Sequence, residues 1–248
     1  MTLRAPSGYR HDSRMPRYNL VFVLPLLLMY ELLAFSLSHD AIAGVRNGAD
    51  VLLKSLFIAM GGWWGLVVFG VLLVGGGAIR VAKDVRLNGR PHGVVFLWMG
   101  AESIGYAMLF GGVTSMLTAL VLGQWTPLAA GPFDQFGLPT QLMISLGAGL
   151  YEELLFRVVL VGGLALLARK GLGWGPRRAG VFAVAVGALI FSAFHYIGPY
   201  GDPFELASFT FRTIAGVLFS GLYLLRGFGI TAWTHALYDV FLALSGGG

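Results

Sequence analysis

Three short motifs hold most of the ionisable residues that fall inside apolar stretches of this chain. They are Glu152-Glu153-x-x-x-Arg157, Phe191-x-x-x-His195 and His235-x-x-x-Asp239. A charge in the middle of a membrane-spanning helix costs at least about 2.5 kcal/mol, so each such residue is a functional candidate. Together the carboxylates and imidazoles could supply a general base, a proton shuttle and an oxyanion donor. These are the groups needed to hydrolyse an amide with water.

The first motif predicts two different roles for adjacent glutamates. Glu153 and Arg157 are four residues apart, so on a helix they face the same way and can form an ion pair. Glu152 is rotated by about 100° from Glu153 and points elsewhere. We therefore expect Glu153 to be held by Arg157 and Glu152 to be free for chemistry. The alternative is a structural ion pair beside an acid that only joins helices.

The two histidine motifs also have helical spacing. His235 and Asp239 share one helix face, where a carboxylate that accepts from one ring nitrogen fixes the tautomer and frees the other nitrogen. Phe191 lies one turn before His195, where an aromatic wall could limit the rotamers of the imidazole. A single intramembrane histidine is more often a helix–helix hydrogen-bonding residue. The combination of all three motifs on separate stretches favours catalysis.

The composition places these motifs in a membrane. Of the 248 residues, 56% are hydrophobic and 12% are charged, whereas a soluble chain carries about 25% charged residues. A helix of about 20 residues crosses the hydrocarbon core. We predict an all-α fold: one integral membrane domain over residues 1–248, built as a polytopic transmembrane bundle of about 7–8 helices with a polar intramembrane cavity. The catalytic motifs occupy residues 139–244, and the predicted spans are 18–38, 51–76, 93–122, 139–168, 179–197, 206–225 and 228–244.

Two of these stretches are longer than one span. Residues 93–122 and 139–168 would each form a helix of about 45 Å, so they must tilt, protrude or break. An eighth span, which would reverse the side of the C-terminus, is most easily missed in the fourth stretch.

The basic residues predict the orientation. Of 17 Lys and Arg residues, two lie within spans (Arg157 and Arg212) and two on the opposite side (Arg46 and Lys54). The other 13 lie on one side: Arg4, Arg10, Arg14, Arg17, Arg80, Lys83, Arg86, Arg90, Arg169, Lys170, Arg177, Arg178 and Arg226. The positive-inside rule then places the N-terminus in the cytoplasm. This distribution favours a membrane protein over a nucleic-acid-binding one.

Features outside the three motifs indicate the cellular compartment and exclude several classes of enzyme. The N-terminal stretch is expected to be a retained signal-anchor, because the cleavage-like Ala41-Ile42-Ala43 lies well past the apolar run. The chain has no cysteine, which excludes disulfides, thiolate metal sites and a cysteine nucleophile. The positive-inside clusters, the absence of cysteine and the Ala-, Gly- and Arg-rich composition fit a bacterial inner membrane. The sequence contains no Gly-x-Ser-x-Gly, His-Glu-x-x-His or Walker A motif.

The three motifs, in this order on successive apolar stretches, resemble those of the type II CAAX prenyl endopeptidases and, more broadly, of CAAX proteases and bacteriocin-processing membrane proteins. The resemblance covers roughly residues 139–244. It implies about eight transmembrane helices around a cavity open to water. It also implies that Glu152, helped by His195, activates the hydrolytic water, and that Glu153 and Arg157 support that helix.

The same resemblance assigns the third motif to the oxyanion. His235 would stabilise it, and Asp239 stands where family members carry Asn or Asp. An ionised Asp cannot donate to an oxyanion, so Asp239 is expected to orient His235.

These residues predict an intramembrane, glutamate-dependent endopeptidase with no cofactor. Its partners would be a membrane protein or peptide substrate and the lipid bilayer, with no nucleic acid. Two alternatives stay open. In one, zinc is bound by Glu152, His195, His235 and Asp239. In the other, a non-enzymatic ion-coupled transporter or immunity scaffold uses the same cluster as a relay.

Three further charged residues match none of the motifs. Arg212 could snorkel or pair locally with Asp202 or Glu205. It could instead contact a substrate's C-terminal carboxylate, or Glu152 and Glu153. We expect Glu31 and Glu102 to be buried polar helix contacts, with a place in the cavity as the alternative.

Overall fold

The computed structural model describes residues 8–37, 45–124, 136–198 and 201–245, so the Ala41-Ile42-Ala43 segment lies outside the described residues. Within these ranges the chain is all helical, as predicted, and has no strand. The elements are α1 (Tyr9–Asp12), α2 (Pro16–Leu37), α3 (Gly48–Gly70), η1 (Val71–Gly75), α4 (Gly76–Asn88), α5 (Gly93–Leu122), α6 (Leu138–Gly147), η3 (Ala148–Val161), α7 (Gly162–Gly171), α8 (Pro176–Phe194), α9 (Leu206–Arg226) and α10 (Phe228–Ser245).

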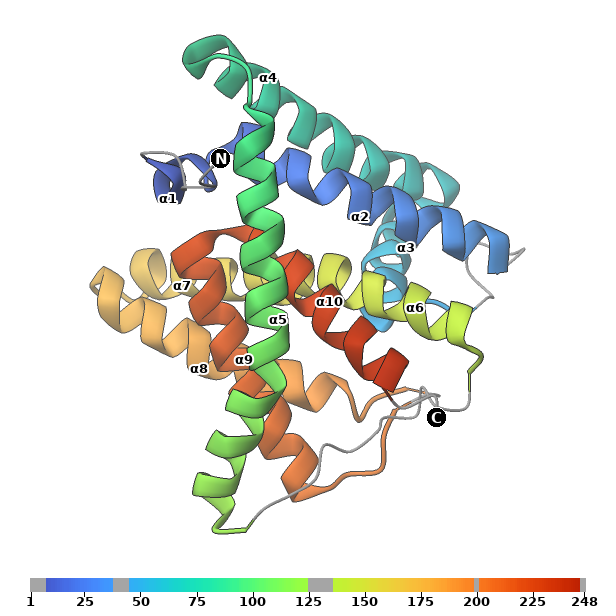
Figure 1. Cartoon of the computed structure of the whole chain (residues 1–248), viewed down its shortest axis with the longest axis vertical. Coiled ribbons are helices and arrows are strands. Elements are labelled where there is room, and N and C mark those ends of the chain that lie inside the picture. Colours follow the sequence, from blue (N-terminus) through green and yellow to red (C-terminus); the bar gives the residue numbers. More distant parts are fainter. Residues whose placement is uncertain (1–7, 38–44, 125–135, 199–200, 246–248) are drawn as a thin grey trace, which may run out of the picture.

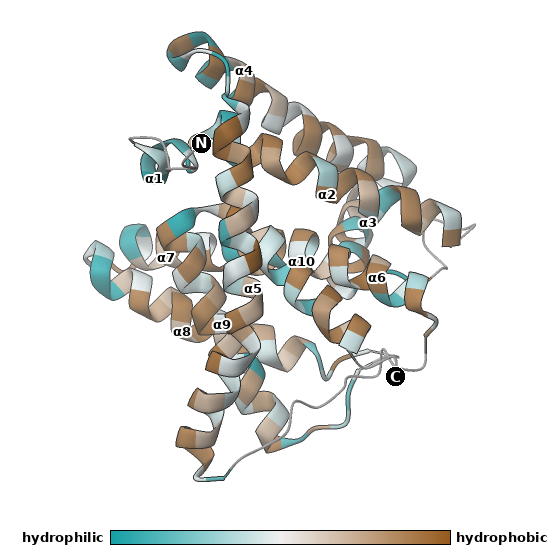
Figure 2. Cartoon of the chain, in the orientation of Figure 1, coloured by the Kyte–Doolittle hydropathy of each residue, from teal (hydrophilic) through white to brown (hydrophobic). Residues whose placement is uncertain are grey.

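The helices form a polytopic membrane bundle. In the described ranges, five are long and apolar enough to cross a membrane: α2, the run α3–η1–α4, α5, α8 and α9. The two remaining long helical segments, Leu138–Gly171 and α10, carry the glutamate and His235 motifs. Large apolar side chains face outward, such as Leu97 and Leu120, which are 70% and 71% exposed. Figure 2 shows hydrophobic residues along most of the helices, which is the surface that lipid requires.

The second predicted span, 51–76, differs from a single straight helix. The backbone leaves helical geometry at Gly61 and Gly62, and Gly62 has a φ of 56°, a left-handed conformation that glycine adopts without a steric penalty. The two arms then pack against one another, with the rings of Phe57 and Phe69 5.1 Å apart. The start of α3, which precedes the kink, packs against η3 and reaches the candidate site.

The fourth stretch is one continuous helical run from Leu138 to Gly171. Its middle part, η3, is a π-helix, a form that is rare in proteins and frequent at functional sites. All three charged residues of the first motif lie in η3. Of the three alternatives for this long stretch, the break is not seen: the run stays helical and changes helix type around the glutamates.

Helix α10 lies in the middle of the molecule, with α5 passing in front of it (Figure 1). It packs closely against η3 because Gly149 has no side chain. A Cβ at Gly149 would lie 2.3 Å from the carbonyl oxygen of Ala232 and 2.6 Å from the Cβ of Ala236. Small residues allow such close approach between membrane helices. This contact brings the third motif to the first.

The predicted grouping of basic segments agrees with the contacts at one end of the bundle. The guanidinium of Arg226 lies 2.6 and 2.7 Å from the two carboxylate oxygens of Glu102 and 3.1 Å from Oγ of Ser13. Arg17 pairs with Asp84 at 3.5 Å. The N-terminal tail, the end of α4, the start of α5 and the end of α9 therefore meet. Glu102 is a polar contact between helices, as expected.

Candidate active site

The structure brings the charged residues of all three motifs together. Oε1 of Glu153 on η3 lies 2.7 Å from Nδ1 of His235 on α10, and Oε2 of Glu152 lies 3.9 Å from Nε2 of His195 at the end of α8. The Nε2 atom of His235 is 3.6 Å from Oδ2 of Asp239. Together with Arg157, these residues form one buried polar cluster at the meeting of three helices.

Glu153 and Arg157 form the predicted i,i+4 ion pair. Oε2 of Glu153 lies 3.1 Å from Nε of Arg157, and the two side chains are 0% and 1% exposed. The guanidinium lies over two aromatic rings, 4.4 Å from the centroid of Phe191 and 5.4 Å from that of Phe219. Arg157 is therefore held by one charge and by two ring faces, which suits a planar guanidinium.

Glu153 also has a role that sequence reasoning missed. Its second oxygen holds Nδ1 of His235, the place that the sequence assigned to Asp239. Asp239 is near the other ring nitrogen, at a distance longer than a hydrogen bond. The Phe219 ring stacks on the imidazole of His235, 4.3 Å between centroids. Nothing in the sequence marked Phe219, because it is one of many phenylalanines on apolar stretches.

His195 is fixed by its own helix. Its Nδ1 lies 2.9 Å from the backbone oxygen of Phe191, which can only accept, so Nδ1 is the donor. In the neutral ring, Nε2 then carries the lone pair and faces Glu152. The ring also packs edge-on against Phe191, 4.9 Å between centroids. The aromatic wall predicted from the Phe191 spacing is confirmed.

Asn47 is a second residue that sequence reasoning missed. Its Nδ2 donates to Oε1 of Glu152 at 2.9 Å, and its Oδ1 accepts from the backbone N–H of Ala49 at 2.9 Å. The second bond makes Asn47 the N-cap of α3 and fixes the direction of its amide. An Asn directly before a helical stretch is an N-cap signal that the sequence did offer. It marked only a helix start, far from the motifs.

Oε2 of Glu152 remains without a hydrogen-bond partner among the described residues and is buried. Buried polar atoms in native proteins are normally paired, so an unpaired one needs an explanation such as a catalytic role. One oxygen of Glu152 is therefore held by Asn47. The other is oriented toward the Nε2 side of His195.

A polar network on α2 and α3 continues from Asn47. The hydroxyl of Tyr30 donates to Asp50 at 2.8 Å and accepts from the backbone N–H of Asn47 at 3.4 Å. Lys54 bridges Asp50 and Glu31, at 2.7 and 3.2 Å. Glu31 is thus a polar contact between helices, as expected, but its side chain is 38% exposed and not buried. The network in which it lies reaches the first motif.

The proposed zinc ligands do not fit a metal site in this arrangement. In the part of the chain that the structure describes, no group of three or more His, Asp or Glu side chains has a geometry that could hold a metal ion.

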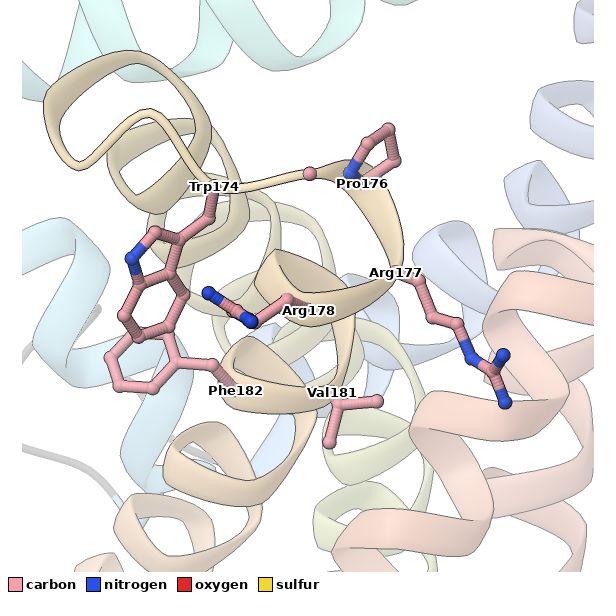
Figure 3. Close-up of a pocket in the computed structure, with 7 residues that line it drawn as sticks. Trp174, Pro176, Arg177, Arg178, Val181 and Phe182 are labelled. Atoms are coloured by element: carbon pink, nitrogen blue, oxygen red, sulfur yellow. The ribbon is translucent and has the colours of Figure 1, made fainter.

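A cavity of about 900 Å³ lies elsewhere, at the turn between α7 and α8. Its lining includes Trp174, Arg178 and Phe182. The guanidinium of Arg178 lies 6.0 Å from the Trp174 ring centroid, while the side chain of Arg177 points away (Figure 3). No motif residue lines this cavity. The candidate site is therefore located by the motif residues and their polar network, and not by this cavity.

Comparison with known families agrees with this location. Residues 134–241 match the family described as type II CAAX prenyl endopeptidase Rce1-like. Searches of curated proteins and of solved structures gave no significant match. The matched segment contains all three motifs and the helices η3, α8 and α10 that carry them. Over residues 134–241, this integral membrane chain is similar to the Rce1-like type II CAAX prenyl endopeptidases.

Proposed function

We propose that this chain is an intramembrane endopeptidase that hydrolyses a peptide bond of a membrane-associated substrate with a water molecule activated by Glu152. The bond would lie near the C-terminus of the substrate or within its transmembrane segment. We further propose that the protein works in a bacterial inner membrane with its N-terminus in the cytoplasm. It would need no cofactor.

The observation that carries the proposal is the pair formed by Glu152 and His195. Two acceptor atoms, Oε2 of Glu152 and Nε2 of His195, face one another at 3.9 Å. They are too far apart to bond directly. A water molecule between them could donate one O–H to each, which would orient its oxygen lone pair for attack. This is the geometry that a general base and its helper require.

In the proposed reaction, Glu152 carries the proton through both steps. The water oxygen attacks the carbonyl carbon as its proton moves to Oε2 of Glu152. The carbon–nitrogen bond breaks as Glu152 returns that proton to the leaving amine. Asn47 keeps Oε1 of Glu152 occupied throughout, so the proton is exchanged at Oε2.

His235 is placed to stabilise the oxyanion. When both its ring nitrogens carry protons, Nε2–H can donate to the oxygen of the tetrahedral intermediate. Glu153 holds Nδ1 at 2.7 Å and is the counterion of that imidazolium. Losing one oxyanion donor typically lowers kcat by about 10²–10³-fold.

The test uses purified protein in lipid nanodiscs and a fluorescence-quenched peptide with a farnesylated CAAX sequence, the substrate class that the family name states. We expect Glu152→Gln and His195→Ala to lower the cleavage rate by about 10²–10⁴-fold while the thermal midpoint stays near that of the wild type. Glu205→Gln, which changes an exposed glutamate at the start of α9, is the matched control and should cleave normally.

Two results would overturn the proposal. One is a Glu152→Gln protein that cleaves at the wild-type rate. The other is a wild-type protein that cleaves neither this peptide nor a panel of transmembrane peptides, yet moves protons across vesicles in a Glu152-dependent way. The second result would support the relay alternative.

A further inference from the structure

A second polar group lies beside His195 and takes no part in the proposed chemistry. Arg212 on α9 pairs through Nη2 with the carboxylate of Asp202. Its guanidinium also lies over the ring of Tyr196, 5.3 Å from the centroid. The local ion pair with Asp202 that the sequence predicted is therefore confirmed.

This group is rigidly connected to the candidate active site. Tyr196 directly follows His195, and the backbone N–H of Asp202 donates to the backbone oxygen of His195 at 2.9 Å. Oγ of Ser192 donates to the backbone oxygen of Phe209 at 2.7 Å, which joins α8 to α9 one turn before Arg212. The positions of Arg212 and Tyr196 are thus set by the same turn that ends the His195 helix.

Two buried donors in this group have no acceptor. Nη1 of Arg212 and the hydroxyl of Tyr196 are both buried and have no hydrogen-bond partner in the described ranges. An unsatisfied buried donor costs about 1–3 kcal/mol, and more when it is charged. Because the Arg212 guanidinium lies over the Tyr196 ring, both donors belong to one local group, and each could bond to an acceptor from another molecule.

The chemistry of the donors selects the acceptor. A guanidinium N–H and a phenolic O–H both donate, and the positive charge favours an anionic oxygen. Asp202 occupies Nη2 and leaves Nη1 available, so Arg212 can hold a second carboxylate without losing the first. A peptide substrate carries one carboxylate at a fixed place, its C-terminus.

We propose that Nη1 of Arg212 and the hydroxyl of Tyr196 bind the free C-terminal carboxylate of the peptide substrate. The inference rests on the proposed endopeptidase function and adds the feature of the substrate that sets its position. Anchoring the chain end beside His195 fixes which peptide bond reaches the water between Glu152 and His195. A substrate with a blocked C-terminus lacks this anchor.

The experiment compares two forms of the farnesylated peptide, one ending in a free carboxylate and the other in a carboxamide. We expect the wild type to cleave the acid with a kcat/KM about 10- to 100-fold higher than that of the amide, mainly through KM, as one charged hydrogen bond implies. Arg212→Gln and Tyr196→Phe should each lose most of the preference for the acid over the amide, seen as a lower ratio of the two kcat/KM values. Tyr196→Phe keeps the ring under the guanidinium, so this variant still tests the proposal if Arg212→Gln fails to fold.

Tyr223→Phe, near the other end of α9, is the matched control and should keep the full acid preference. Equal cleavage of acid and amide by the wild type would overturn the carboxylate site and leave the endopeptidase proposal intact. If the wild type cleaved neither of these peptides and no transmembrane peptide, the proposed function itself would be overturned. A Tyr196→Phe protein that keeps the wild-type acid preference would also reject the site.

Discussion

His235 lies between two carboxylates that have different functions. Glu153 makes a short contact to Nδ1 and is fully buried, whereas Asp239 lies 3.6 Å from Nε2 with 28% of its side chain exposed. A ring held at Nδ1 keeps its orientation when the other contact changes. Asp239 is therefore the more replaceable of the two carboxylates.

We predict that Asp239→Asn keeps substantial peptidase activity, that Asp239→Leu loses most of it, and that His235→Ala loses nearly all. An asparagine keeps a polar group near Nε2 of His235 and can donate to an oxyanion, whereas a leucine does neither. The measurement is cleavage rate against pH for the three variants. If Asp239→Asn were as inactive as His235→Ala, the ionised carboxylate of Asp239 would itself be required for catalysis.

Arg157 should matter more for stability than Glu152. Removing Arg157 leaves Glu153 as a buried charge without its cation, which costs about 3–5 kcal/mol. We predict that Arg157→Ala lowers the thermal midpoint in detergent much more than Glu152→Gln does. Arg157→Lys is the matched variant: it keeps the charge, loses the planar contact with Phe191 and Phe219, and should fall in between. Equal midpoints for Arg157→Ala and Glu152→Gln would contradict a structural role for the pair.

At the scale of the element, the start of α3 supports a residue on η3. Asn47 caps α3 through its Oδ1 and positions Glu152 through its Nδ2. A segment outside the matched region 134–241 thereby contributes to the candidate site. The side chain of Asn47 therefore both caps α3 and orients the proposed base, Glu152.

The two functions of Asn47 can be separated by substitution. Serine is as good an N-cap as asparagine, but its shorter side chain cannot reach Glu152 while it caps Ala49. We predict that Asn47→Ser keeps the thermal midpoint within a few degrees and lowers kcat by about 10-fold, roughly one hydrogen bond to a charged group. Asn47→Ala should lose both stability and activity. Wild-type kcat in Asn47→Ser would show that Glu152 does not depend on this contact.

At the scale of the whole molecule, the basic segments define one side of the bundle. Figure 1 shows the turn between α4 and α5 and the far end of α5 at opposite extremes of the structure. The 30 residues of α5 span about 45 Å, enough to cross the membrane. The two ends of α5 therefore report the orientation of the protein.

We predict that, in intact bacterial cells, a membrane-impermeant thiol reagent labels Gln124→Cys and spares His92→Cys. Each introduced cysteine is unique because the chain has none. Both positions are exposed and flank α5. Labelling after cell lysis is the control and should reach both variants. The reverse pattern in intact cells would place the N-terminus outside and contradict the positive-inside prediction.

The sequence by itself determined what depends on local spacing and composition. Low charge and high hydropathy required a membrane bundle, and the i,i+4 spacing fixed the ion pair between Glu153 and Arg157. The i,i+4 spacing of Phe191 and His195 likewise predicted the ring contact that the structure confirms. These features follow from helix periodicity, which acts over one or two turns.

Only the tertiary structure decided which helix each polar atom meets. The bond from Glu153 to His235 exists because Gly149 lets α10 approach η3. The bond from Asn47 to Glu152 joins residues 105 positions apart, because the N-terminus of α3 packs against η3. Such contacts are set by packing between surfaces that are distant in sequence. Periodicity gives the face of a helix, but the partner of that face depends on how closely the backbones can approach.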